Sequence, residues 1–155
     1  MPLPASFIRA MQLHLSQEEL SSFLHSLEEE PEVSVRYNPF KPIRHLSSEQ
    51  ARVKWSSAGY YLSTRPPFTF DPHFHAGGYY VQEASSMFLE QALRQIPNPS
   101  IVLDLCAAPG GKSTLLRSLL PEDSFLVSNE PVRKRAQILA ENIIKWGHEA
   151  CMVTC

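Results

Sequence analysis

The sequence predicts an α/β protein in which a small α+β lobe precedes a Rossmann-like parallel sheet. From Ile101 onward, apolar runs alternate with stretches of helical periodicity and short loops. This alternation favours parallel strands joined by right-handed crossovers. A Gly-rich turn at residues 106–111 follows the first apolar run, as in folds that bind nucleotides. We therefore assign residues 1–72 to the lobe and residues 73–155 to a partial Rossmann-like domain, truncated in or after its third strand.

The lobe begins with two predicted helices. Residues 4–15 carry apolar side chains at helical spacing, and Ser16–Glu19 forms a capping-box pattern that starts the second helix. Residues 33–37 alternate apolar and polar, which predicts a half-buried strand that stops before Pro39. Residues 39–78 are rich in Pro, Gly, Ser and aromatics, and short strands are expected there at Lys54–Trp55 and Tyr60–Leu62.

The second part starts with a predicted helix at residues 82–96. Strand, helix, strand, helix and strand then follow, with the strands at residues 101–106, 124–128 and 149–155. Gly147 suits the position just after the last helix, where a left-handed residue commonly ends a helix.

The turn between the first of these strands and its helix can approach a ligand closely. Pro109 stiffens it, and its other side chains are small: Ala107, Ala108, Gly110 and Gly111. The glycines can adopt positive φ angles, and the helix that follows directs free N–H groups and its positive dipole end at the turn. An anionic group such as a carboxylate or phosphate is the expected ligand.

Two nucleotide-binding motifs are excluded here by single residues. A Walker A loop would need glycine where Cys106 stands, although Gly111-Lys112-Ser113 fits its end. A dinucleotide fingerprint needs separated glycines, but Gly110 and Gly111 are adjacent. A nucleoside with a small anionic tail remains the best fit. Glu130, at the carboxyl end of the second strand, is placed to accept hydrogen bonds from ribose hydroxyls.

Four segments together resemble the Nol–Nop–Sun family of RNA cytosine-C5 methyltransferases. DLCAAPGGKST, residues 104–114, is similar to the family's motif I, and residues 78–87 are similar to the segment that leads into its methyltransferase domain. The other two segments match the family's RxN-P-x-K pattern and its second-helix pattern, through Arg36, Asn38, Pro39 and Lys41 and through Glu130, Arg135, Leu139, Asn142, Lys145 and Gly147.

The resemblance implies S-adenosylmethionine as cofactor and the N-terminal half of a Rossmann-like methyltransferase sheet. It implies cofactor contacts from Cys106, Ala107, Ala108, Pro109, Gly110, Gly111, Lys112, Glu130 and Arg135. A solvated lysine is the alternative for Lys112, and an exposed basic turn is an equal alternative for Arg135. In that sheet the strand at 101–106 would be central, so its unpaired edge here is expected to permit self-association.

The expected activity is methylation of ribosomal or transfer RNA to 5-methylcytosine. The family uses two cysteines beyond motif I, and the chain's three cysteines match neither position: Cys106 lies in the turn, Cys151 in a strand, and Cys155 ends the chain. We therefore assign no catalytic residue and expect the 155-residue chain alone to be inactive. The alternative is a non-catalytic module, derived from such an enzyme, that binds cofactor or RNA.

Composition limits the remaining classes. The chain of 155 residues has a net charge of −2, which gives no support to RNA binding by bulk charge. The local candidates for RNA contact are Arg36 and Lys41, among basic residues interleaved with aromatics. His73 and His75 with Asp71 lack a fourth ligand, so no metal is expected. No secretory leader or membrane-length apolar run is visible, and the unpaired cysteines suit a reducing cytoplasm.

Overall fold

The computed structural model describes residues 3–41 and 50–155, and the chain divides into two compact units, Met1–Pro31 and Glu32–Cys155. The first unit is a helical pair, α1 (Ala5–Met11) and α2 (Gln17–Ser26). The capping box is present, since the Ser16 hydroxyl accepts the Glu19 amide and the Glu19 carboxylate accepts the Ser16 amide. The boundary between residues 72 and 73 stays a prediction.

An antiparallel sheet begins the second unit. Its strands are β1 (Val33–Tyr37), β2 (Gly59–Leu62) and β3 (Tyr79–Val81), in the order β2-β1-β3. Val35 and Tyr37 of β1 pack with Phe68 and Tyr79 in one core, while Ser34 and Arg36 on the opposite face are also buried. The Lys54–Trp55 strand was wrongly predicted, because β2 pairs there only through one isolated bridge, from Arg52 to Tyr60.

Short helices follow β2 and β3. Within the antiparallel sheet, η1 (Phe68–Phe70) and α3 (Pro72–His75) connect β2 to β3, and η2 (Ser85–Phe88) and α4 (Leu89–Leu93) connect β3 to β4 of the second sheet. The continuous helix predicted over residues 82–96 is therefore wrong. The Ala84 carbonyl accepts the Met87 amide at 3.0 Å and the Trp55 indole N–H at 2.7 Å, an i→i+3 pattern that makes the start of this segment a 3₁₀ helix.

The parallel type of the second sheet was correctly predicted. Its strands are β4 (Ile101–Asp104), β5 (Phe125–Asn129) and β6 (Cys151–Thr154), in the order β4-β5-β6. The crossovers contain α5 (Gly111–Leu119) and α6 (Arg133–Trp146), and α6 ends at Gly147 in the left-handed conformation expected for it. The first strand ends at Asp104 rather than at Cys106, because the chain turns there toward α5.

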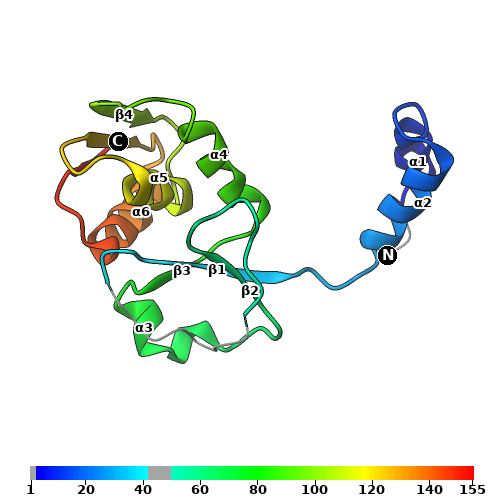
Figure 1. Cartoon of the computed structure of the whole chain (residues 1–155), viewed down its shortest axis with the longest axis horizontal. Helices are drawn as coiled ribbons and strands as arrows, with labels where there is room; N and C mark the ends of the chain where they lie inside the picture. The colour runs from blue at the N-terminus through cyan, green and yellow to red at the C-terminus, as the bar shows by residue number, and fades with distance from the viewer. Residues whose placement is uncertain (1–2, 42–49) are drawn as a thin grey trace. The chain divides into compact units, whose positions relative to one another are not determined.

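Helices α5 and α6 lie between the two sheets of this unit (Figure 1). Leu126 of β5 packs against Leu116 of α5 and against Leu120, which directly follows this helix, on the inner face of the parallel sheet. The outer face is bare in the described part of the chain, since Ile101 is 74% exposed and Leu103 is 55% exposed. Strand β4 pairs only with β5 among the described residues, and the self-association expected from this edge stays a prediction. No helix in residues 3–41 or 50–155 has the length and apolarity to cross a membrane.

Candidate functional site

Asp104, the last residue of β4, shapes the turn that follows. One carboxylate oxygen accepts the Cys106 amide at 3.3 Å and the other accepts the Ser113 hydroxyl at 2.7 Å. The two bonds join the end of β4 to the first turn of α5, so the residues between them form a closed loop. Sequence reasoning did not assign a role to Asp104 or Ser113, although a carboxylate at the end of a parallel strand is a usable signal.

Gly110 allows this loop to turn into α5. Its φ is +110°, in the left-handed region that disfavours any side chain, and it occupies the N-cap of the helix. A Cβ at this position would lie 3.3 Å from Leu139 and 3.4 Å from Asn142 of α6. The backbone angle therefore favours glycine, and the close approach of α6 leaves little room for a side chain.

Side chains of α6 hold the loop from behind. Asn142 donates to the Pro109 carbonyl at 2.8 Å, and Arg135 donates to the Ala108 carbonyl at 3.3 Å. The Ala107 amide donates to Asn129 at the end of β5, and the Ala107 side chain packs against Leu139 and Ile143. The peptide bond between Ala108 and Pro109 is cis. The loop is thus fixed to both β5 and α6, and the Arg135 contact is with the loop itself.

The first turn of α5 presents free donors. Among the described residues the amides of Gly111, Lys112 and Ser113 form no hydrogen bond, and of these three residues only Ser113 is buried. Lys112 and Cys106 are exposed beside them, whereas Ala107 and Gly110 are buried. Free helix N-terminal amides next to a lysine and a small-residue loop favour an anionic group.

Glu130 follows β5 and is 2% exposed. One carboxylate oxygen accepts the Val132 amide at 3.0 Å, and the other lies 3.3 Å from the Arg135 guanidinium. The backbone amide of Glu130 donates to Thr154 of β6. Its carboxylate therefore lies at the carboxyl edge of the sheet, where sequence reasoning placed it, but it is paired with Arg135, a pairing not foreseen.

Arg36 of β1 lies in the interior, contrary to the RNA-facing surface predicted for it. Its side chain is 1% exposed and donates to the Gln82 amide oxygen at 2.8 Å and to the Thr114 hydroxyl at 2.6 Å. It also donates to the Gly111 carbonyl at 3.2 Å, and it stacks 4.5 Å from the ring centre of Trp146. Burial lowers the pKa of Arg36 to about 9, so it is still protonated at neutral pH. Arg36 therefore holds α5 against β1, and this role replaces the RNA contact predicted for it.

The side chains of Asn38 and Lys41 also form hydrogen bonds within the protein. Asn38 donates to the carbonyls of Gly77 and Trp146, each at 2.8 Å. The Lys41 ammonium donates to the carbonyls of Ala76 and Lys145. Together they satisfy carbonyls at the C-terminal end of α6, where a cation is also favoured by the helix dipole. The Lys41 ammonium, for which an RNA contact was predicted, is thus already hydrogen-bonded within the protein.

The structure also locates the cysteines and the histidines considered in the sequence analysis. Cys106 and Cys155 are exposed and Cys151 is partly buried, and none forms a disulfide. Burial raises the pKa of the Cys151 thiol, which disfavours a thiolate there. His73 contacts Asp71 at 3.2 Å, and no group of three or more His, Cys, Asp or Glu among the described residues could hold a metal ion.

Two known protein-family models match this chain. Residues 3–84 match the N-terminal domain of 16S rRNA methyltransferase RsmF, and residues 91–155 match the 16S rRNA methyltransferase RsmB/F model. The chain belongs to the RsmB/F family of 16S rRNA methyltransferases. This membership confirms the resemblance to the Nol–Nop–Sun enzymes.

Curated members of the RsmB/F family extend well beyond this sequence. Ribosomal RNA small subunit methyltransferase F of Aeromonas hydrophila subsp. hydrophila is 31% identical, over 94% of this chain and 34% of its own length. The protein of the same name from Vibrio campbellii is 29% identical, over 94% of this chain and 33% of its own length. The chain thus spans about a third of the length of these relatives.

Solved structures agree on the fold. A methyltransferase homologue from Pyrococcus horikoshii superposes with a TM-score of 0.70 at 25% identity, over 98% of this chain and 56% of the other. NSun6 from Pyrococcus horikoshii gives a TM-score of 0.79 at 15% identity, over 97% of this chain and 65% of the other. Because the identity to NSun6 is only 15%, this similarity supports the fold and nothing further. The predicted α/β class is therefore confirmed.

Proposed function

We propose that these residues are the N-terminal lobe and cofactor-binding half of a ribosomal RNA cytosine-C5 methyltransferase that uses S-adenosylmethionine. The observation that carries the proposal is the loop at residues 105–110, closed by Asp104 and followed by three free amides. Membership of the RsmB/F family and the rRNA methyltransferases among its relatives support the substrate class.

The residues present fit this cofactor. The amides of Gly111 and Lys112, with the Lys112 ammonium, suit the carboxylate of the methionine part. Cys106, Ala107, Ala108, Pro109 and Gly110 form the small-residue wall that allows close approach. Glu130 would receive the ribose hydroxyls, and Arg135 would fix that carboxylate and the loop at once.

Bound S-adenosylmethionine would supply the methyl group. Cytosine C5 becomes nucleophilic only after a thiolate adds to C6, which requires a positioned, deprotonated cysteine. Cys106 lies in the proposed cofactor wall, Cys151 has a raised pKa, and Cys155 contacts the Pro131 carbonyl. We infer that the 155-residue chain binds cofactor but transfers no methyl group by itself.

Calorimetry with S-adenosylmethionine tests the cofactor site. Glu130→Gln should weaken binding by about 1–3 kcal/mol, because a charged hydrogen-bond acceptor is lost. Glu122→Gln changes an exposed acid outside the site and serves as the matched control. Equal affinity of the Glu130→Gln chain and the control would remove Glu130 from the site. No binding by the unchanged chain would refute a preformed cofactor half.

Incorporation of labelled methyl into unmodified small-subunit rRNA tests the second inference. We expect background levels with the 155-residue chain. Methylation above background that Cys106→Ser, Cys151→Ser or Cys155→Ser abolishes would identify a nucleophile within these residues.

A further inference from the structure

A pocket of about 190 Å³ lies between β3 and the C-terminal half of α6, apart from the proposed cofactor wall. Its lining comprises Phe74, Gly77, Tyr79, Tyr80, Val81, Asn142, Lys145 and Trp146. Sites for drug-sized ligands have volumes of roughly 300–1,000 Å³. This pocket therefore suits a single ring system and is too small for a whole cofactor.

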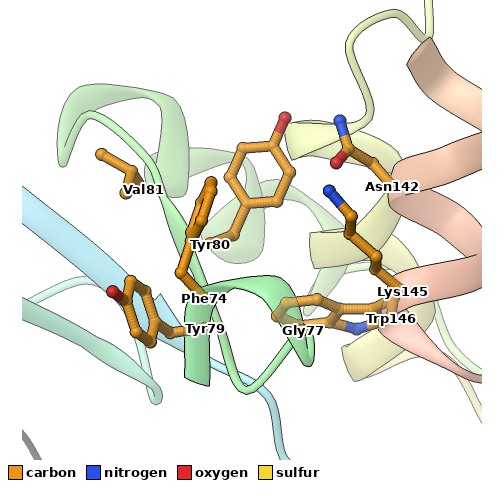
Figure 2. A pocket seen from close by; sticks show the side chains of 8 residues that line it. All are labelled: Phe74, Gly77, Tyr79, Tyr80, Val81, Asn142, Lys145 and Trp146. Atoms are coloured by element: carbon orange, nitrogen blue, oxygen red, sulfur yellow. The ribbon is translucent and has the colours of Figure 1, made fainter. Parts of the chain in front are cut away.

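Polar groups converge on the pocket from two elements. Figure 2 shows Asn142 and Lys145 projecting from α6 toward Tyr80 of β3. In the described part of the chain, the Tyr80 hydroxyl and the Lys145 ammonium have no hydrogen-bond partner, and Asn142 uses only its amide nitrogen, on Pro109. A donor and acceptor hydroxyl, an acceptor oxygen and a cation are thus available to a ligand.

Aromatic rings supply the rest of the wall. Phe74 is partly exposed, and its ring centre lies 5.9 Å from the Lys145 ammonium. Trp146 also lines the pocket but is buried, and the Arg36 guanidinium stacks 4.5 Å from its ring centre. No acidic residue lines the pocket. An aromatic wall, hydrogen-bonding tips and an uncompensated cation match a nucleobase attached to a phosphate.

We propose that this pocket binds one unstacked base of single-stranded RNA, with Lys145 at the adjoining phosphate. The proposal rests on the proposed function, since it assigns a contact to the same RNA substrate. Asn142 links the pocket to the cofactor loop through the Pro109 carbonyl, and the Tyr80 ring lies 3.3 Å from where a Gly111 Cβ would be. A base in the pocket would contact residues that directly support the loop.

The test is fluorescence anisotropy of a labelled short oligocytidylate RNA with the 155-residue chain. Phe74→Leu and Tyr80→Phe remove the aromatic ring and the hydroxyl respectively, and the second substitution is nearly isosteric. Phe74→Leu should weaken binding roughly tenfold by loss of stacking. It should leave the weaker binding of a matched abasic oligomer unchanged, because that probe has a backbone but no base.

Lys145→Met removes the charge but keeps the backbone carbonyl that accepts Lys41. It should reduce the slope of affinity against salt by about one phosphate contact. Lys134→Met, an exposed lysine on the same helix outside the pocket, is the matched control and should leave RNA binding unchanged.

Unchanged oligocytidylate affinity in all three pocket variants would overturn the proposal. Equal weakening of the base-bearing and abasic probes by Phe74→Leu would do so too, because that result indicates a general structural effect. If the unchanged chain binds S-adenosylmethionine in calorimetry while the pocket variants bind RNA normally, only this inference fails. If the chain binds neither cofactor nor RNA, the proposed function fails with it.

Discussion

The two three-stranded sheets of residues 32–155 differ in how much of their surface the chain itself covers. Strand β1 of the antiparallel sheet is buried on both sides, with Val35 in one core and Arg36 against α5. The parallel sheet is buried only on the side of α5 and α6, and its outer face presents Ile101 and Leu103 to solvent. Parallel sheets are normally covered on both faces. The antiparallel sheet thus has its central strand covered on both faces by these residues, whereas the parallel sheet has one face exposed.

The two faces of the parallel sheet should respond very differently to truncation of a leucine. Leu126→Ala, on the inner face, should cost about 2–5 kcal/mol of unfolding free energy, the usual range for a fully buried leucine. Leu103→Ala, on the outer face, should cost less than about 1 kcal/mol, because little contact is lost. Urea unfolding monitored by tryptophan fluorescence measures both, since Trp55 and Trp146 lie in this unit. Equal costs would mean that the outer face is covered in solution, for example by self-association.

Replacing the buried Arg36 tests how much stability the contact between the antiparallel sheet and α5 provides. Arg36→Met keeps an unbranched side chain but leaves the Gln82 oxygen and the Thr114 hydroxyl without their donor. We expect a loss of about 2–3 kcal/mol, since a buried polar group without a partner costs about 1–3 kcal/mol. Arg133→Met, on the exposed side of α6, should change stability by less than about 0.5 kcal/mol in the same urea assay. A small effect of Arg36→Met would show that the contact between β1 and α5 does not depend on this side chain.

The smallest expected effect on stability is that of Glu90, and this effect depends on pH. Burial raises the pKa of its carboxyl, but hydrogen bonds from Arg94 and Ser57 outweigh burial and leave the pKa below its ordinary value of 4.5. The folded state therefore binds its proton less readily than the unfolded chain. Its contribution is present above about pH 4.5 and is lost as pH falls through the lower, folded pKa.

Glu90→Gln should remove this acid-dependent part of the stability. The difference between neutral and acidic pH should shrink by about 1 kcal/mol, a modest value because Arg94 is screened by solvent. Glu83→Gln, an exposed neighbour, should leave the pH profile unchanged. Identical dependence of stability on pH for both variants would show that protonation of Glu90 does not weaken its contacts with Ser57 and Arg94 in this pH range.

Sequence reasoning succeeded where structure depends on local chemistry. The loop at 105–110 and its left-handed Gly110 follow from residue types within a few positions, and the parallel type of the second sheet follows from alternating strands and helices. Arg36 could not be placed in this way. The alternation of Val33, Val35 and Tyr37 puts Arg36 on the opposite face of β1, and only α5, far along the chain, makes that face an interior.

The Glu130 pairing and the pocket beside Lys145 were not predicted either. The pairing is local, since Arg135 lies five residues after Glu130 in the first turn of α6, and it depends on the turn between β5 and α6. The pocket depends on tertiary packing, because Tyr80 and Asn142 line it from two elements far apart in the chain. The segment 82–96 also makes a tertiary contact that its sequence does not reveal, since the indole N–H of Trp55 donates to the Ala84 carbonyl.

The inward hydrogen bonds of Arg36 and Asn38 also set an order of events during synthesis. Arg36 reaches residues 75 and 78 positions later in the chain, and Asn38 reaches Trp146, 108 positions later. Contacts between residues so far apart form late and slow the folding of a domain. Domains fold as the ribosome releases them from the N-terminus. Strand β1 therefore emerges well before α5, and Arg36 stays solvated at least until Thr114 of α5 has left the exit tunnel.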